Sequence, residues 1–591
     1  MYKAPVSEIA HALKSVAGLS EALDKGLFPD LSDDLVDAIL EEAGRFASDR
    51  IAPLHIPGDR QGARCANGEV TMPDGYKTLY QDWIAGGWNS LAAHPEYGGQ
   101  GLPTMLAMAV AEMWNSASMG FGLVSTLTMG AIEAIEAHAS DDLKTKYLPK
   151  LISGEWSGTM NLTEPQAGSD VGALRSRAEP VGDGTYRIFG QKIFITYGEH
   201  DMTDNIVHLV LARLPGAPSG TRGISLFLVP KFFVGDDGSI GPRNDVFCHS
   251  IEHKLGIHAS PTCTMIYGDG KFGDEPGAIG WLIGEENRGL ACMFTMMNNA
   301  RLCVGVEGAA VAEAARQKAV AYANERRQGK APGWTGEGMS PIVQHPDVRR
   351  DLLTMTSLSQ ASRAICYACA HAIDMSRVHD GDEANFWHER ASLLTPIAKA
   401  FSTDIGSQVA SIGVQVHGGM GFIEETGAAI FMRDARIAQI YEGTNGIQAI
   451  DLVMRKLQQS DGACVDAYFG ELDAILVELA ASNNPSFGAS ADRLKEAMAD
   501  LRAATDALNA MLHGGDIPAA LAGATPYLRL FGLAAGGIYL AKSALADAES
   551  DERATLCRFF AENLVAETAS LRRTVETGAA SLHAAGEFLV A

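Results

Sequence analysis

Apolar residues recur at helical spacing over much of residues 32–155. In the first run, Ser32 precedes four apolar residues that lie three or four positions apart: Leu35, Ile39, Ala43 and Phe46. This spacing places side chains on one face of an α-helix, and serine is a preferred N-cap residue. Glycine and proline interrupt the pattern at residues 94–102, after which it resumes up to Leu148. We therefore expect a helical first domain.

From about residue 157 the pattern becomes that of β-strands. Four segments, separated by Gly, Pro and Asp, are rich in β-branched and aromatic residues: 185–196, 205–214, 223–230 and 262–268. No long helical run lies between them, which disfavours a doubly wound α/β sheet. We expect an antiparallel sheet domain.

Helical spacing returns after residues 286–290, and an alanine-rich helical tail follows. In the tail, we expect Ser490 to cap a helix that ends at Gly514-Gly515. The uncharged stretch 530–541 is shorter than the roughly 20 residues that cross a bilayer. We therefore expect a core helix there and no membrane span.

The patterns together predict a mainly α protein with a central antiparallel β domain. We divide the chain into five parts: an N-terminal extension (1–34), a helical domain (35–156), a β domain (157–283), a second helical domain (284–462) and a C-terminal helical domain (463–591).

The charge balance bears on the partners of this chain. Its 591 residues include 47 Lys plus Arg and 72 Asp plus Glu, a formal charge of −25. Such an acidic surface repels the phosphate backbone, so we expect no nucleic-acid partner.

The nine cysteines are odd in number and sparse, as is typical of a reducing compartment. The chain opens with no secretion or import signal, so we expect a cytoplasmic protein.

Several common site motifs are absent or isolated. Cys366 and Cys369 form a C-x-x-C pair, which is compatible with redox chemistry, a metal or a buried helix. We favour the helix because neither a second such pair nor a nearby His pair accompanies it. The paired glycines at 98–102 and 417–422 do not follow a strand and open a helix, as a Rossmann loop must. P-loop and H-E-x-x-H motifs are missing, and we expect no metal site.

Six longer strings occur in order along the chain: NLTEPQAGSD (161–170), GQKIFITYGE (190–199), KLGIHASPT (254–262), NNARLCVGVEGAA (298–310), QVHGGMGF (415–422) and RDARIAQIYEGTNGIQ (433–448). Together they resemble the acyl-CoA dehydrogenase family in order and spacing, over about residues 35–460. The first and last strings are the most specific pair. The opening MYKAPV and the extra C-terminal helices resemble a long-form subgroup, which includes enzymes acting on 3-(methylthio)propanoyl-CoA.

The resemblance implies a fold of a helical domain, a β domain and a four-helix bundle, and FAD-dependent oxidation of an acyl-CoA to its trans-2-enoyl-CoA. Glu442 matches the family's base for the α-proton. The alternative is that Glu442 is an ordinary surface residue in a loop that ends a helix. A minority of members carry the base one residue before the Arg matched by Arg301. Here that residue is Ala300, which cannot accept a proton, and this favours Glu442.

Cofactor contacts follow from the same resemblance. Thr163 and Thr196 match residues that hydrogen-bond the flavin ring, and Phe194 stands where many members have a Trp against it. Met160 and Leu162 are expected to approach the ring through backbone atoms. For the threonines the alternative is β-propensity alone, and for Phe194 and Met160 it is core packing.

Further residues are implied for the rest of the FAD. Ser169 matches a pyrophosphate contact, and Thr444 a contact to the phosphate or ribityl region. Four residues resemble those that reach the FAD of an adjoining subunit, which implies a homodimer: Arg326, Gln415, Gly418 and Gly419. The string around Arg326 departs from the family's E-R-x-x-F-G, so a solvated cluster of charges is the alternative there.

Substrate contacts are implied for Ser169, Arg301, Asn298, Tyr441 and Gly443. Asn298 replaces the usual Asp, and Gly446 replaces a frequent Gln, so those contacts are expected to differ from the family pattern. The acyl chain is left open between 3-(methylthio)propanoyl-CoA and the fatty acyl-CoAs of fatty acid metabolism.

Three functions remain open at this point. The first is a dehydrogenase that passes electrons to an electron-transfer flavoprotein, and the second an oxidase whose reduced flavin reacts with oxygen. The ending EFLVA lacks a peroxisomal S-K-L signal and favours the first. The third is a catalytically silent FAD-binding or scaffold protein, against which the intact Glu442, Thr163 and Thr196 argue.

Overall fold

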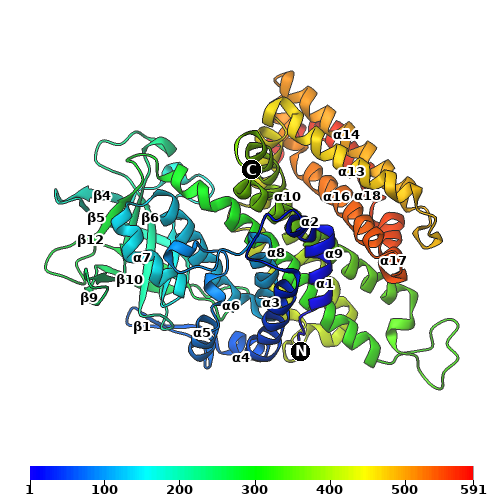
Figure 1. The fold of residues 1–591 in the computed structure, drawn as a ribbon, viewed down its shortest axis with the longest axis horizontal. Coiled ribbons are helices and arrows are strands. Elements are labelled where there is room, and N and C mark those ends of the chain that lie inside the picture. Colours follow the sequence, from blue (N-terminus) through cyan, green and yellow to red (C-terminus); the bar gives the residue numbers. More distant parts are fainter. Residues whose placement is uncertain (590–591) are drawn as a thin grey trace. The chain divides into compact units, whose positions relative to one another are not determined.

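The computed structural model describes residues 1–589, in two compact units. One comprises Met1–Ala47, Thr104–Ala117 and Arg301–Ala591, and the other comprises Ser48–Pro103 and Ser118–Ala300. Helices α6 (Thr104–His138) and α8 (Gly289–Glu325) contribute to both (Figure 1). In α6 the division falls at Ser118, whose φ of −163° and ψ of 104° are not helical. The predicted C-terminal domain includes residues 590–591, which lie outside the described part.

The unit of residues 48–103 and 118–300 is built on an eight-stranded sheet, in which the path β10-β11-β5-β12-β7-β6-β3 is continuous and β4 pairs with β5. The strands are β3 (Trp156–Asn161), β4 (Arg177–Pro180), β5 (Thr185–Thr196), β6 (Asn205–Ala212), β7 (Ser225–Pro230), β10 (Val246–Ile251), β11 (Thr262–Tyr267) and β12 (Ala278–Ile283). The four predicted segments form β5, β6, β7 and β11. The predicted antiparallel sheet is confirmed except that β3 and β6 run parallel.

The central strands separate two apolar cores. Every residue of β6 and β7 is buried, and successive side chains alternate between the cores. Leu209 and Leu211 lie in one cluster, whereas Val210 and Ala212 lie in the other. Side chains of a strand point alternately to its two faces, so a strand covered on both faces needs a continuous apolar run. The runs NIVHLVLA and SLFLVP meet that need.

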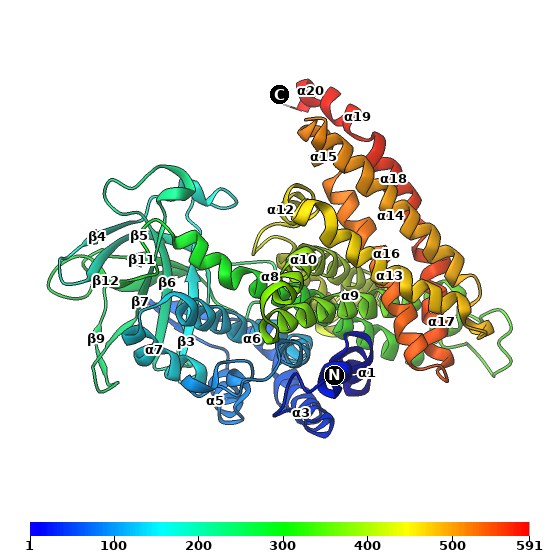
Figure 2. The same ribbon diagram turned by 45° about the horizontal axis from the view of Figure 1, so that its top comes forward.

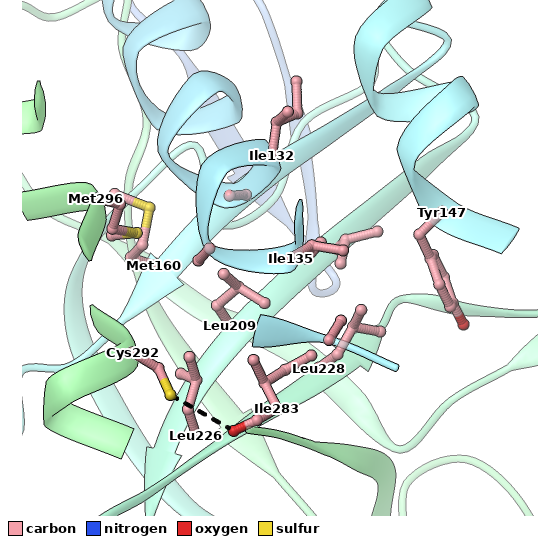
Figure 3. Packing of buried hydrophobic residues seen from close by; sticks show 14 of the residues in the cluster. Ile132, Ile135, Tyr147, Met160, Leu209, Leu226, Leu228, Ile283, Cys292 and Met296 are labelled. Carbon is pink, nitrogen blue, oxygen red and sulfur yellow. Dashed lines mark hydrogen bonds between the residues drawn. The ribbon is translucent and has the colours of Figure 1, made fainter. Parts of the chain in front are cut away.

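Helices cover the first of these cores, as Figure 3 shows. Ile132 and Ile135 come from α6, Tyr147 comes from α7 (Asp141–Ser153), and Met296 from α8 lies next to Met160 of β3. The same unit contains four smaller strands and two further helices: β1 (Arg64–Ala66), β2 (Glu69–Thr71), β8 (Phe232–Val234), β9 (Ile240–Arg243), α4 (Ala52–Gln61) and α5 (Tyr76–Ala85).

The other unit is helical (Figures 1 and 2). Besides its parts of α6 and α8, it contains α1 (Val6–His11), α2 (Leu19–Asp24), α3 (Asp33–Phe46), α9 (Pro346–Val378), α10 (Gly381–His417), α11 (Ala429–Ala435), α12 (Asn445–Asp451), α13 (Ala463–Ala481), α14 (Ser490–His513), α15 (Ile517–Ala522), α16 (Ala524–Ala546), α17 (Asp551–Phe559), α18 (Glu567–Thr577), α19 (Ala579–Ala584) and α20 (Gly586–Leu589). Short 3₁₀ and π-helical turns connect several of them.

The two predicted helix caps have different outcomes. The Ser32 hydroxyl accepts the Leu35 N–H at 3.2 Å and caps α3, as predicted. The prediction for Ser490 is wrong. Ser490 is the first residue of α14, and its buried hydroxyl donates to the carbonyl of Phe487 instead. The predicted end of this helix is confirmed, with Gly514 as its C-cap.

Glycines let the helices of this unit approach closely. A Cβ atom at Gly532 of α16 would lie 2.2 Å from the ring of Phe401 on α10. A Cβ at Gly308 of α8 would lie 2.4 Å from the Ser402 carbonyl oxygen, also on α10. These contacts require glycine because any side chain would separate the helices. The crossing at Gly308 positions residues of the candidate site.

Two helices bear out predictions of core packing, α16 and α9, and α6 is buried in the same way. In the most apolar 18-residue stretch of each helix, 89% of α6 and 78% of α16 is buried. Both are long and apolar enough to cross a membrane, but such burial is typical of core helices. Cys366 and Cys369 are buried in α9, where their thiols contact the hydroxyls of Ser402 and Thr395 respectively.

The N-terminal extension packs on the C-terminal helices. Ile9, Leu13 and Leu19 are fully buried. Glu8 accepts two hydrogen bonds from the Arg553 guanidinium, at 2.9 and 3.0 Å. Buried apolar side chains and this forked ion pair make the extension an integral part of the helical unit.

Candidate active site

Glu442 lies in a short loop between the 3₁₀ turn Arg436–Gln439 and helix α12. Its φ is 55° and that of Gly443 is 85°, so both residues are left-handed. Glycine adopts this conformation freely, whereas for glutamate it costs on the order of 1–3 kcal/mol. Strain of this kind persists where surrounding contacts hold it, and it clusters at functional sites.

Side chains from two helices hold this loop. The buried Lys399 ammonium on α10 donates to the Gly443 carbonyl at 2.8 Å and to Asn445 Oδ1 at 2.9 Å. Gln448 Nε2 donates to the Glu442 carbonyl at 3.4 Å. The Thr444 hydroxyl accepts the Ile447 N–H at 3.3 Å and caps α12. The backbone on both sides of the Glu442 side chain is therefore fixed.

The surroundings of Glu442 raise the pKa of its carboxyl group and so make it a stronger base. Its side chain is partly buried. Burial raises the pKa of this carboxyl, and the positive charges of Arg301 and Lys399 oppose that rise. Burial likewise lowers the pKa of Lys399 to about 8, against the attraction of Glu442. A carboxylate whose pKa is raised by burial is well suited to take a proton from a weak carbon acid.

Arg301 lies near this carboxylate and is itself buried. It is 6% exposed and pairs with Asp451 at 3.8 Å. Its Nε has no hydrogen-bond partner among the described residues. Buried donors normally have partners, so this unpaired N–H is unusual and marks Arg301 as a candidate site residue. Asn298, which precedes Arg301 by one turn of α8, is half-buried.

Two residues near Glu442 escaped the sequence analysis. Lys399 and Glu307 are fully buried, and the Tyr441 hydroxyl donates to Glu307 Oε2. The only sequence signal was a charged residue within an apolar helical run, in PIAKAF and VGVEGA. Such residues are almost never fully buried without a partner, so they mark a site once burial is known.

A second set of predicted residues gathers where α8 and α10 end. The rings of Tyr322 and His417 stack at 4.4 Å, which brings these two helix ends together. Arg326 follows α8, and Gln415, Gly418 and Gly419 lie at the end of α10 or just beyond it. All four are exposed. A Cβ at either glycine would meet no atom within 4 Å, so open space lies beside that backbone.

The remaining predicted residues lie in the β-sheet unit. Phe194 sits at an irregularity in the pairing of β5 with β11, with φ of 60° and 59% of its surface exposed. A bulge re-aims the side chain it contains. With 59% of its surface exposed, Phe194 is not packed in the core, so the alternative interpretation as core packing does not describe it.

Hydrogen bonds to their backbone carbonyls hold Thr163 against the bulge and Thr196 against β3. The Ile193 N–H donates to the Thr163 carbonyl at 2.9 Å, and the Thr159 hydroxyl donates to the Thr196 carbonyl at 2.7 Å. Both threonines are partly exposed. Thr163, just after β3, and Thr196, the last residue of β5, thus lie near the exposed residue Phe194.

A buried ion pair supports the Thr163 segment. Lys192 donates to the Leu162 carbonyl at 3.0 Å and to Glu164 Oε1 at 2.8 Å. Glu164 also accepts the N–H groups of Arg175 and Ser176. Leu162 is partly exposed and Ser169 fully so, whereas the Met160 side chain is buried in the core. Core packing therefore accounts for the Met160 side chain. The approach of its backbone to the flavin ring stays a prediction.

Four family models match the chain in succession. They are the "Acyl-CoA dehydrogenase, N-terminal domain" (34–155), the "Acyl-CoA dehydrogenase, middle domain" (159–269), the "Acyl-CoA dehydrogenase, C-terminal domain" (287–457) and the "Acetyl-CoA dehydrogenase C-terminal like" domain (468–585). The chain belongs to the acyl-CoA dehydrogenase family. The resemblance inferred from the six strings is confirmed, including the additional C-terminal domain.

Individual acyl-CoA dehydrogenases are similar over most of the chain. The 3-methylmercaptopropionyl-CoA dehydrogenase of Ruegeria pomeroyi is 47% identical, over 92% of this chain and 91% of its own. A butyryl-CoA dehydrogenase of Syntrophomonas wolfei is 35% identical, over 84% and 82%. The solved acyl-CoA dehydrogenase of Bacillus anthracis, described as complexed with FAD, has a TM-score of 0.72 and 21% identity, over 93% and 89%. At that identity it shows the shared fold.

Proposed function

We propose that this protein oxidises an acyl-CoA thioester to the trans-2-enoyl-CoA, with Glu442 as the base that removes the α-proton. One observation supports this most directly: a strained, left-handed Glu442 lies in a partly buried loop, where burial raises the pKa of its carboxyl against the opposing charges of Arg301 and Lys399. A proton α to a thioester is weakly acidic, so its removal needs a positioned carboxylate of raised pKa.

Neighbouring groups assist this base. Negative charge develops on the thioester oxygen as the proton leaves, and a backbone N–H aimed at that oxygen stabilises it. The Glu442 N–H is our choice for this donor, and Gly443 lets the thioester approach the backbone. Arg301, Asn298, Tyr441 and Ser169 are the proposed further contacts to the acyl-CoA.

The residues present are compatible with FAD. Phe194 offers an exposed aromatic face, and Thr163 and Thr196 offer hydroxyls beside it for the flavin ring. The Met160 and Leu162 backbones are proposed to adjoin the ring, with Ser169 at the pyrophosphate and Thr444 at the phosphate or ribityl region. When bound, FAD accepts the β-hydrogen as hydride. The relative complexed with FAD shares the fold that supports this choice.

Four residues at the ends of α8 and α10 are proposed to serve the FAD of a second subunit: Arg326, Gln415, Gly418 and Gly419. Next to them, Phe422 is 86% exposed, and Met420 and Ile423 are 48% and 44% exposed. Exposed apolar clusters of this kind mark interfaces. An Arg fork suits a pyrophosphate, particularly on an acidic protein. We therefore propose a homodimer, testable by light scattering of the FAD-loaded protein.

The substrate and the electron acceptor complete the proposal. The relatives are named for 3-methylmercaptopropionyl-CoA and butyryl-CoA, so we place 3-(methylthio)propanoyl-CoA first among short acyl-CoAs. Turnover with that thioester and with butanoyl-, octanoyl- and palmitoyl-CoA ranks them. We propose an electron-transfer flavoprotein as the acceptor, in the cytoplasm. Oxygen consumption without any added acceptor would indicate an oxidase instead.

The Glu442→Gln variant tests the central claim. It keeps the size of the side chain but cannot take a proton, so we expect turnover to fall by roughly 10³-fold or more while FAD stays bound. Glu425→Gln, a change at an exposed carboxylate in the turn Glu424–Thr426, is the matched control and should leave turnover unchanged. Rapid bleaching of the flavin by acyl-CoA in Glu442→Gln would refute the assignment.

A further inference from the structure

Glu307 is a carboxyl group sealed inside the helical unit beside the proposed base. It lies on α8 with no exposed surface. The next residue, Gly308, lets α10 approach so closely that a Cβ there would lie 2.4 Å from a backbone oxygen. The Tyr441 hydroxyl donates to Glu307 Oε2, and Oε1 has no partner among the described residues.

This environment favours the neutral acid. A buried carboxylate with one oxygen unpartnered is costly, whereas a protonated one carries its own hydrogen there. Burial raises the pKa of Glu307 to about 8; Tyr441 and Lys399 lower it, and Glu442 raises it further. Burial and Glu307 also raise the pKa of Tyr441, so the phenol keeps its proton. At neutral pH the pair is an uncharged acid bonded to an uncharged phenol.

We propose that Glu307 is a positioning residue for the base: its neutral carboxyl anchors Tyr441 and thereby fixes the strained backbone of Glu442. The proposal rests on the function proposed above. Tyr441 immediately precedes Glu442, and Lys399 binds the carbonyl of Gly443, which immediately follows it. The loop is thus held on both sides from two crossing helices. The anchor at Tyr441 adds no negative charge beside the base.

Three variants separate anchoring from other roles. Glu307→Gln keeps a neutral acceptor for the Tyr441 hydroxyl, so turnover at pH 7 should stay within about twofold of wild type. Glu307→Leu and Tyr441→Phe each remove the bond, and we expect kcat to fall by about tenfold or more in both. KM should change little in Glu307→Leu, which leaves the proposed acyl-CoA contact of Tyr441 in place. The double variant Glu307→Leu/Tyr441→Phe should be no slower than the worse single variant, because both remove one interaction.

The pH dependence of turnover distinguishes this role from mere structural support, which would not change that dependence. Wild type and Glu307→Gln should superimpose below about pH 8 and separate above it, since only wild type can ionise there. Profiles that already separate below pH 7 would overturn the proposal, because Glu307 would then be ionised where the base works, as would a large loss in Glu307→Gln at pH 7. So would unchanged kcat in Tyr441→Phe, which tests the bond if Glu307→Leu does not fold. A wild-type protein inactive on every acyl-CoA would instead defeat the proposed function.

Discussion

At the scale of single residues, a left-handed backbone separates Glu442 from every other described carboxylate residue except Asp461, whose φ is 54°. Glu442 adopts φ of 55°, and four side-chain or backbone contacts from α10 and α12 surround the loop that contains it. A flexible loop would relax to remove the strain. The contacts prevent that, so the carboxylate is directed by its backbone as well as by its rotamer.

Gly443→Ala should reduce turnover without removing any functional group. Gly443 has φ of 85°, and an added Cβ would lie 2.6 Å from Gln448 Nε2. Either the loop or the Gln448 amide that binds the Glu442 carbonyl must shift, and the left-handed φ is strained for alanine. A displacement near 1 Å can cost about 100-fold in rate. We expect kcat to fall by roughly 10–100-fold while FAD absorbance is retained.

Gly446→Ala is the matched control, three residues further along. Its Cβ would meet only Thr444 Oγ1, at 3.9 Å, and its φ lies outside the left-handed region. Steady-state kinetics of the two variants should therefore differ by an order of magnitude. Equal turnover in both would mean that the position of the loop does not limit the reaction.

At the scale of elements, the sequence predicted what local pattern determines. β5 was predicted over its observed range, and the cap at Ser32 was correct because it depends on neighbours in the chain. The parallel pairing of β3 with β6 was missed because strand direction depends on distant segments. Similarly, the bulge that exposes Phe194 arises from its pairing with β11.

The candidate site was predictable only in part for the same reason. The motif strings identified Glu442, Thr163 and Thr196 as candidates. Lys399 belongs to none of the six strings, and Glu307 lies in one of them (298–310) without being singled out there. Their importance appears only once α8 and α10 cross at Gly308. A buried charge is recognised by what surrounds it in space, which a local pattern does not contain.

Gly532→Ala should destabilise the helical unit. α16 packs against α10 at this glycine, where a Cβ would lie 2.2 Å from the Phe401 ring. Overpacking of this kind costs about 1–3 kcal/mol. Gly470→Ala, at an exposed site in α13 with no atom within 4 Å, should instead stabilise by about 0.5–1 kcal/mol. Urea unfolding of both variants gives the comparison, and equal shifts would contradict the close α16–α10 contact.

At the scale of the whole molecule, each unit contains a buried carboxylate that depends on nearby cations. In the β-sheet unit, burial raises the pKa of Glu164, but Lys192 and the N–H of Arg175 outweigh it and bring the pKa to about 2. In the helical unit, burial raises the pKa of Glu313, and Arg316 and Arg363 bring it to about 2. Both values lie below the ordinary 4.5.

Acid should therefore destabilise both units in the same pH window. A carboxyl whose pKa is lower in the folded than in the unfolded state stabilises the fold above the unfolded pKa. That stability is lost as the pH falls from about 4.5 to about 2. Each group contributes on the order of 3 kcal/mol at neutral pH. Urea unfolding at a series of pH values, followed by hydrogen exchange in each unit, measures the loss.

Single variants assign this pH dependence to its source. In Glu164→Gln or Glu313→Gln the group can no longer take up a proton on unfolding, so the slope of unfolding free energy against pH should fall by up to about 1.4 kcal/mol per pH unit within the window. Each variant is also less stable at neutral pH, because a cation is left buried without its partner. Glu425→Gln, at an exposed site, should leave the slope unchanged. Slopes equal to wild type in both buried variants would mean that acid unfolding starts elsewhere.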